Sequence, residues 1–402
     1  MTSPEITLEA VPGINEILSA SWDACANPDG RVPPGSSPPC GRAYNPFVSH
    51  AFFSALEASG SATLRTGWAP RHLVAKRGDE ILGVVPCYLK SHSQGEYVFD
   101  RGWADAYERA GGRYYPKLQV SVPFTPATGP RLLIRADQDR DVIGNALTQG
   151  LKALCGISEA SSVHVTFAQK PEWDLLAAQG FLQRTDQQFH WHNQGFSTFD
   201  DFLATLNSRH RKAMKRERRD ALAAGITIHW LTGKDITEDA WDAFFEFYME
   251  TGSRKWGRPY LTRKFFALIG ESMADDVLLV MAKREGRWIA GAINFIGSDT
   301  LFGRNWGAIE HHPFLHFEVC YYQAIDFAIA HKLRVVEAGA QGEHKIARGY
   351  LPQTTYSAHY IADRGLRRAV DDYLKRERAY VEEVGRELAE SAPFRKGADE
   401  PS

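Results

Sequence analysis

The densest group of polar side chains in the sequence lies between Glu337 and Arg348. It reads Glu-Ala-Gly-Ala-Gln-Gly-Glu-His-Lys-Ile-Ala-Arg and follows a short apolar run, Val335-Val336. Such a run is typical of a buried strand, and Gly339 and Gly342 allow the backbone to turn sharply or to approach a ligand closely. A simple connection between a strand and a helix does not require so many charged groups. We therefore predict that this stretch carries the active site.

These residue types can accept and donate protons and can bind an anion. In an acyl transfer to an amine, for example, the attacking nitrogen must lose a proton to a base, and the resulting oxyanion must be stabilised. The candidate bases are Glu343 and Glu318, with His344 as a competitor, and Glu337 completes the set of candidate catalytic residues. Two of them also have a structural interpretation, because Glu318 suits a helix N-terminus and His344 could simply hydrogen-bond within a turn.

Cations and aromatic residues elsewhere in the chain are candidates for holding the donor or the acceptor. Arg304 and Trp306 alternate with Phe302 on a predicted strand, so the three should share one face, although an ion pair with Glu337 would explain Arg304 equally well. The aromatic segment that contains Asp100 could line an acceptor pocket or serve only local packing. The residues that we expect to bind donor or acceptor are Arg254, Lys255, Trp256, Arg304, Trp306, His316, Gln341, Lys345, Arg348, Asp100, Trp103 and Tyr107.

The elements that must position these residues occur twice. The sequence from Ala75 to Val85 matches that from Ala282 to Ile293, and each copy is predicted to be a hairpin. Further along, Gly-Phe-Leu-x-x-Thr at Gly180 matches Gly-Tyr-Leu-x-x-Thr at Gly349. Because both matches occur in the same order, we interpret the chain as an internal duplication.

With 402 residues, the chain is too long for one ordinary hydrophobic core and should form two domains. We expect the second domain to be catalytic, since only this copy carries the charged stretch. The predicted parts are an N-terminal helix and loop over 1–44, with the helix at 5–25; a first domain over 45–195; and a second over 196–402, which includes a basic helix at 199–224 and a C-terminal helix at 366–388.

Composition limits the classes of function. A net charge of −2, with 44% apolar and 24% charged residues, is typical of a soluble globular protein. The five cysteines lie far apart without a CxxC motif, which indicates free thiols in a reducing compartment. We expect no signal peptide, no membrane span and no metal site, and we predict a cytoplasmic protein of unspecified oligomeric state.

A strongly basic run extends from Arg209 to Arg219, where seven of eleven residues are Lys or Arg. Such a run could contact the phosphates of a tRNA by charge alone. It could equally be a solvated helix face whose cations pair with neighbours such as Glu217 and Asp220.

Four stretches carry a resemblance to a known family: Asn-Pro-Phe-Val-Ser-His at 45–50, the segment 97–107, Leu-Asn-Ser-Arg-His-Arg-Lys at 206–212, and the region 315–349. Through them the sequence resembles the FemAB-like, peptidoglycan-related branch of the GNAT N-acyltransferase superfamily. The resemblance implies an α/β (α+β) chain of two tandem GNAT-like domains. Each would be a mixed, mostly antiparallel sheet flanked by helices, with acyl transfer to an amine in the second.

The sequence departs from this superfamily at one functional position. GNAT enzymes that use acetyl-CoA carry a (Gln/Arg)-x-x-Gly-x-(Gly/Ala) loop, which cradles the pyrophosphate at a helix N-terminus. Here residues 309–318 read Ile-Glu-His-His-Pro-Phe-Leu-His-Phe-Glu. We expect no permanently bound cofactor, with either acyl-CoA or, as the departure favours, aminoacyl-tRNA as co-substrate. The alternative is a non-catalytic module that binds a cell-wall precursor or another small anionic ligand.

Overall fold

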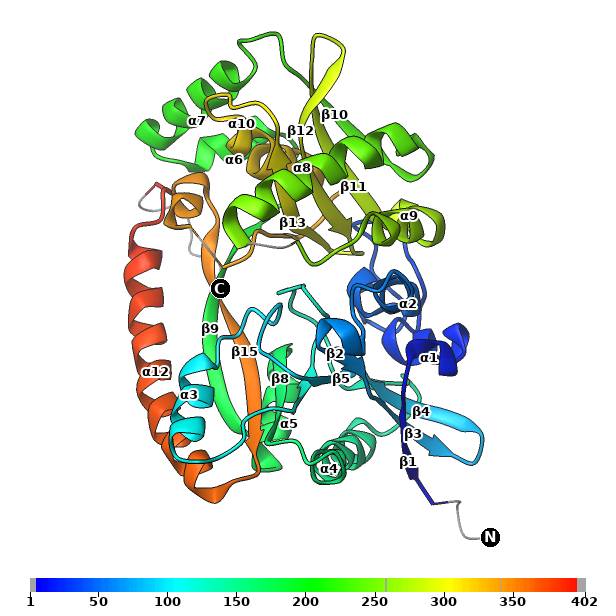
Figure 1. Cartoon of the computed structure of the whole chain (residues 1–402). Coiled ribbons are helices and arrows are strands. Elements are labelled where there is room, and N and C mark those ends of the chain that lie inside the picture. The colour runs from blue at the N-terminus through cyan, green and yellow to red at the C-terminus, as the bar shows by residue number, and fades with distance from the viewer. Residues whose placement is uncertain (1–4, 257–258, 341, 396–402) are drawn as a thin grey trace. The chain divides into compact units, whose positions relative to one another are not determined.

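The computed structural model describes residues 5–256, 259–340 and 342–395, apart from the side chains of 253–256 and 343 (Figure 1). The chain divides into two compact units. Unit 1 comprises Met1–Gly30, Pro39–Asp186 and Thr354–Glu383, whereas unit 2 comprises Arg31–Pro38, Gln187–Gln353 and Val384–Ser402.

Unit 1 is built on two groups of strands. One sheet has the order β1-β3-β4-β7, and the other strands follow the order β15-β8-β6-β5-β2. Its elements up to β9 are β1 (Thr7–Val11), η1 (Ile14–Glu16), α1 (Ser19–Ala26), η2 (Pro46–Val48), α2 (His50–Ala58), η3 (Leu64–Thr66), β2 (Trp68–Pro70), β3 (His72–Arg77), β4 (Glu80–Val85), β5 (Cys87–Lys90), α3 (Arg101–Arg109), β6 (Lys117–Val120), β7 (Leu133–Ile134), α4 (Arg140–Ile157), β8 (Ser162–Ala168), α5 (Lys170–Ala178) and β9 (Leu182–His192).

Unit 2 contains strands in the order β10-β11-β12-β13-β14-β9. Helix α8 lies across β12 and β13, as Figure 1 shows. The remaining elements of the chain, of which β15 and α12 lie mostly in unit 1, are α6 (Phe199–Thr205), α7 (Ser208–Ala221), β10 (Thr227–Thr232), η4 (Gly233–Asp235), α8 (Glu238–Trp256), α9 (Arg263–Ser272), η5 (Ala274–Asp276), β11 (Val277–Arg284), β12 (Arg287–Ile296), β13 (Thr300–Ala308), α10 (Leu315–Phe317), η6 (Glu318–Tyr322), α11 (Gln323–Ala330), β14 (Val335–Glu337), η7 (Glu343–Arg348), β15 (Leu351–Ile361) and α12 (Arg364–Glu390).

In each unit the described residues include a parallel strand pair joined through a helix. In unit 1, β6 and β8 are registered at three positions and α4 lies between them in the chain. In unit 2, β13 and β14 are likewise registered at three positions, with α11 between them in the chain. A parallel connection needs a crossover, and a helix supplies it in both cases.

The segments that match in sequence adopt the same local structure. Both predicted hairpins are antiparallel, formed by β3 with β4 and by β11 with β12. Gly180 and Gly349 have φ values of 85° and 84°, a left-handed conformation that favours glycine. An eleven-residue strand begins two residues after each glycine.

Local sequence signals explain some helix ends but not others. The Ser49 side chain accepts a hydrogen bond from the Phe52 N–H and so caps α2. The helix expected over 5–25 is wrong in its first part, because Thr7–Val11 is a strand paired with β3 and the helix begins at Ser19. The basic helix expected over 199–224 is two helices, since Asn207 caps a new helix by accepting from the His210 N–H.

Candidate functional site

The candidate site in unit 2 begins where β13 and β14 part. Among the described residues their pairing ends at Phe302 and Glu337, while β13 continues to Ala308. The register of β13 against β12 also shifts, because Gly303 lies opposite Asn294 but Trp306 lies opposite Ala292. This bulge adds one residue and reverses the alternation.

The bulge changes which side chains share a face. Residues directly opposite each other in an antiparallel pair point to the same face, so Phe302 shares a face with Phe295, and Trp306 shares a face with Ala292. Phe295 and Ala292 are three positions apart on β12 and therefore point to opposite faces. Trp306 therefore lies on the opposite face from Phe302. The predicted shared face is wrong for this pair, because simple alternation does not anticipate an extra residue.

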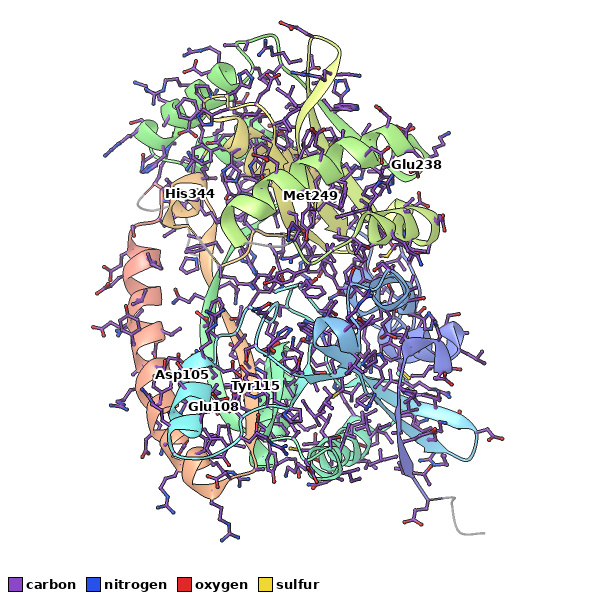
Figure 2. The ribbon with its side chains drawn as sticks, viewed as in Figure 1. Asp105, Glu108, Tyr115, Glu238, Met249 and His344 are labelled. Atoms are coloured by element: carbon purple, nitrogen blue, oxygen red, sulfur yellow. The ribbon has the colours of Figure 1, made fainter. Side chains whose placement is uncertain are left out.

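Trp306 belongs to a group of aromatic side chains from four elements. Its ring centroid lies 5.2 Å from that of His316 in α10, and His316 lies 5.4 Å from Tyr321 in η6 and 6.3 Å from His344 in η7. Phe317 lies 5.5 Å from His344. We call Trp306, His316, Phe317, Tyr321 and His344 the aromatic cluster; Figure 2 labels His344.

His344 has the properties of a base. Its side chain is exposed, and its Nε2 lies 3.1 Å from the Tyr321 hydroxyl. Loss of solvation, followed by the charges of Arg348 and Lys345, lowers the pKa of His344 below its usual value. The imidazole is therefore neutral at pH 7. Burial raises the pKa of Tyr321, so the phenol keeps its proton. The pair can exchange one proton across this hydrogen bond.

Lys345 fastens the loop before η7. Its ammonium group donates to the carbonyl oxygens of Ala338 and Gly339, the latter at 3.1 Å. Burial lowers the pKa of Lys345 to about 8.

Arg348 is also engaged within the protein. It donates from Nη2 to Glu217 at 2.8 Å and from Nη1 to the His344 carbonyl oxygen at 2.7 Å. Its guanidinium lies 3.5 Å from the centroid of the Phe317 ring. The buried Nε has no hydrogen-bond partner among the described residues.

Glu318 is held by cationic and amide donors. Its side chain is fully buried at the start of the π-helical turn η6. Both of its oxygens accept hydrogen bonds from Arg218, at 3.1 Å and 2.9 Å, and Gln323 donates to one of them at 2.7 Å. Arg218 also donates to Asp326 at 2.6 Å. Among the described residues, the Glu318 oxygens accept hydrogen bonds from the Arg218 and Gln323 side chains alone, so this acid belongs to an ion pair and does not cap the helix.

The other predicted residues of unit 2 are placed as follows. Glu337 is buried at the end of β14, and its Oε1 lies 3.9 Å from Nε2 of His190 on β9. Burial lowers the pKa of His190 to about 3, so this ring is neutral. Arg304 is half-buried on β13. Gln341 and the side chains of Glu343, Arg254, Lys255 and Trp256 lie outside the described part of the structure.

The three predicted residues of unit 1, Asp100, Trp103 and Tyr107, do not belong to the aromatic cluster of unit 2. Asp100 is buried and accepts hydrogen bonds from the Lys117 ammonium and, at 2.7 Å, from the Tyr114 hydroxyl. Trp103 is buried with its ring 5.0 Å from His359, and Tyr107 is half-buried on α3. On the same helix, Asp105 and Glu108 are labelled in Figure 2; Asp105 is exposed.

The basic run forms α7, whose cations divide between two faces. Arg218 points inward to Glu318, while Lys215 pairs with Asp200 at 2.9 Å. A row of exposed cations spaced by three, four and three residues occupies one outer face, and we call it the cationic row: Arg209, Lys212, Arg216 and Arg219. Within the described structure, only Arg219 of this row forms an ion pair, with Asp220 at 2.8 Å.

Sequence reasoning missed Tyr321, Glu217 and the inward role of Arg218. Tyr321 had no sequence signal beyond its place in an aromatic segment. Glu217 and Arg218 could be distinguished from the surrounding charges only by helical phase, because they fall on the same side of α7 as buried Met214 and Ala221.

Two further features are absent from the part of the chain that the structure describes. No group of three or more His, Cys, Asp or Glu side chains there could hold a metal ion. None of the helices described is both long and apolar enough to cross a membrane.

Comparison with solved structures shows the fold. FemX matches with a TM-score of 0.54 at 13% identity, covering 88% of this chain and 98% of FemX. L-PGS from Bacillus licheniformis matches at 0.50 and 10% identity, covering 87% and 98% of the two chains. A conserved protein of unknown function from Bacteroides thetaiotaomicron matches at 0.50 and 10% identity, covering 88% and 99%. The mixed α/β fold class predicted from the sequence is confirmed.

Comparison at the level of sequence gives the family. No curated protein matches the chain. The FemAB-like family model, described as peptidoglycan biosynthesis/recognition, matches residues 13–396. This match confirms the resemblance found in the sequence and supports the predicted link with peptidoglycan. The chain belongs to the FemAB-like family.

Proposed function

We propose that this protein is an N-acyltransferase that forms an amide, with its chemistry in unit 2. The observation that carries the proposal is the His344–Tyr321 pair, an exposed neutral imidazole 3.1 Å from a protonated phenol. It lies in a cluster with Trp306, on the part of β13 that continues beyond its pairing with β14. Perturbed titratable groups that contact one another are typical of catalytic sites.

The reaction requires one bond to form and one to break. The nitrogen of the amine attacks the acyl carbon, and His344 accepts the proton that the nitrogen loses. The bond between the acyl carbon and the oxygen or sulfur of the carrier then breaks. Tyr321 supplies the proton that this leaving group needs, and it is reprotonated from His344 across their hydrogen bond. The products are an amide and the free carrier.

The remaining predicted catalytic residues take other roles in this proposal. Glu318 anchors η6, because Arg218 already binds both of its oxygens. Glu343 stays a candidate second base beside His344. Lys345 and Arg348 hold the loop that carries His344, and Arg254 and Lys255 stay candidates for binding an anionic group.

For the donor we propose an aminoacyl-tRNA. The cationic row gives α7 four exposed positive charges between Arg209 and Arg219, which suits a chain of phosphates. The sequence also lacks the loop with which acetyl-CoA-dependent GNAT enzymes hold a pyrophosphate. For the acceptor we propose an amine of a peptidoglycan precursor, in keeping with the family description. This donor agrees with the cytoplasmic location expected from the sequence.

The test is a transfer assay with a labelled acyl group. Wild-type protein is supplied with aminoacyl-tRNA or acyl-CoA, together with amine-bearing peptidoglycan precursors. We expect transfer from aminoacyl-tRNA, and His344→Gln should lower kcat about 100-fold to 10,000-fold. His229→Gln is the matched control, because this histidine lies on β10 and hydrogen-bonds Thr227 outside the aromatic cluster. Wild-type turnover by His344→Gln would exclude His344 as the base.

The donor is tested separately by neutralising the cationic row. The triple variant Arg209→Gln, Lys212→Gln, Arg216→Gln should weaken tRNA binding and reduce its salt dependence, by about one unit of slope for each phosphate that the variant no longer neutralises. Transfer from acyl-CoA alone would overturn the proposal that tRNA carries the acyl group, but it would support the proposal that the protein is an acyltransferase. Precursor binding without transfer from either donor would favour a non-catalytic binding module.

A further inference from the structure

Helix α7 presents a second functional face, opposite the cationic row. Two adjacent residues on its inner side, Glu217 and Arg218, bind the two segments that carry His344 and Tyr321. Neighbouring residues on a helix point about 100° apart, so one turn of α7 can reach both segments.

Glu217 is connected to the segment that carries His344 through the side chain of Arg348. Its Oε2 accepts a hydrogen bond from Arg348 Nη2 at 2.8 Å, and the Tyr322 hydroxyl donates to the same oxygen. From its other terminal nitrogen, Arg348 donates to the backbone carbonyl oxygen of His344 at 2.7 Å. The side chains of Glu217 and Arg348 are 12% and 7% exposed, so water screens this ion pair little.

Arg218 holds the other segment in a similar way. Its two hydrogen bonds to Glu318 fix the first residue of η6, and Tyr321 lies three residues later in the same turn. The guanidinium is itself packed 4.4 Å from the centroid of the Phe199 ring. Bidentate pairing of this kind restrains orientation as well as distance.

We propose that Glu217 is a positioning residue for His344, acting through Arg348, and that Arg218 does the same for Tyr321 through Glu318. This inference rests on the proposed function in one respect, namely that His344 acts as the base and Tyr321 as the acid. It goes beyond that function by assigning α7 two tasks. The outer face would bind the anionic carrier of the acyl group, and the inner face would hold the base and acid that act on that group.

The closing experiment compares Glu217→Gln with Lys215→Gln. The first removes the charge that holds Arg348 and keeps the size of the side chain. The second, on the same helix, breaks an exposed ion pair with Asp200 that leads to neither segment. Two readouts are taken: steady-state kinetics, and titration of the His344 ring by NMR with labelled histidine, assigned with His344→Gln.

For Glu217→Gln we expect kcat to fall about 10-fold to 100-fold with little change in KM, because the base is displaced while the carrier is still bound. We also expect the His344 titration midpoint to move down by about half a pH unit, since the charge of Arg348 is no longer balanced. Lys215→Gln should match wild type in kcat and in the His344 titration, because its ion pair is connected to neither segment. A folded Glu217→Gln variant with a wild-type His344 titration would overturn the proposal.

A second variant, Arg348→Lys, and a readout that does not require turnover complete the experiment. If Glu217→Gln does not fold, Arg348→Lys replaces it, because a single ammonium group cannot reproduce the planar fork that reaches both Glu217 and His344. The NMR titration does not depend on turnover. If no transferase activity is found but the titration moves as expected, the proposed function fails while the positioning role stands.

Discussion

The two units use polar side chains near their parallel strand pairs in different ways. In unit 1 they are buried and bind one another, whereas unit 2 has, beside its own ion pairs, an exposed imidazole next to a single phenol. The residue types overlap, since both places contain His, Tyr, Glu and a cation. What differs is exposure and the number of partners.

Lys117 shows the arrangement in unit 1. Its side chain is fully buried, and the ammonium group donates to Glu96 at 2.6 Å, to Ser93 at 2.8 Å and to Asp100. Nearby, Lys90 lies 3.5 Å from the centroid of the Trp68 ring, and burial lowers its pKa to about 7. These groups are strongly perturbed, yet the ammonium of Lys117 is saturated by protein partners.

A shifted pKa alone therefore does not identify a site. Buried ion networks perturb titration for architectural reasons, and they lie away from solvent. His344 combines a shifted pKa with exposure and a proton-exchanging neighbour, which is what a reaction needs. Three measurements test whether the two units differ in this way.

The largest effect is expected from Lys117→Met. Removing the ammonium group leaves the buried Asp100 carboxylate without its cation and leaves Glu96 with only the more distant Lys90, at 3.7 Å, which typically costs about 3–5 kcal/mol. Chemical denaturation followed by circular dichroism measures the loss. Lys170→Met is the control, because its ion pair with Asp174 is exposed and should leave the denaturation midpoint unchanged. If both variants behaved alike, the network of unit 1 would not be structural.

A smaller effect is expected from acid. Burial, and then the charge of Lys117, lower the pKa of His164 to about 3, against about 6.5 in the unfolded chain. The unfolded state therefore binds more protons between these values, so stability is intact above pH 6.5 and falls as the pH drops towards 3. This group alone should contribute a loss of about 2 kcal/mol at pH 5. Denaturation series at pH 7 and pH 5 test it, and His164→Asn should show a weaker pH dependence than wild type.

The third measurement compares the matched glycines. Gly180→Ala places a side chain in open space but in a left-handed conformation, which costs about 1–2 kcal/mol. Gly349→Ala adds a clash, since its Cβ would lie 2.7 Å from the Phe202 ring, so about 1–3 kcal/mol more is expected. Equal losses for the two variants would show that Phe202 moves aside. The test uses the same denaturation assay.

The sequence could predict features that depend on neighbouring residues. The Ser49 cap, the antiparallel hairpins and the left-handed Gly349 are of this kind, since their signals lie within a few residues. Pairings between distant parts could not be predicted. The strand at Thr7–Val11 exists because it pairs with β3, and Arg218 finds its carboxylate 100 residues further along the chain.

For the candidate site, composition singled out the stretch after β14, and His344 was among the residues named there; its catalytic role stays a prediction. The bulge in β13 could not be foreseen, because no residue in that strand requires it, and it decides which face Trp306 occupies. Likewise, the composition of the Glu318 segment gave no sign that this acid is bound by Arg218 and that Tyr321, three residues later, contacts His344.

The contact between His164 and His359 in unit 1 determines where two protons reside. Their Nδ1 atoms are 2.7 Å apart, so one ring must donate there and the other must present a lone pair. Nε2 of His164 lies 2.7 Å from the Ser162 hydroxyl, whereas Nε2 of His359 has no hydrogen-bond partner among the described residues. An unpartnered lone pair is less costly than an unpartnered N–H. His359 should therefore be the Nδ1–H tautomer and His164 the Nε2–H tautomer, a fixed pair of complementary tautomers inside the sheet.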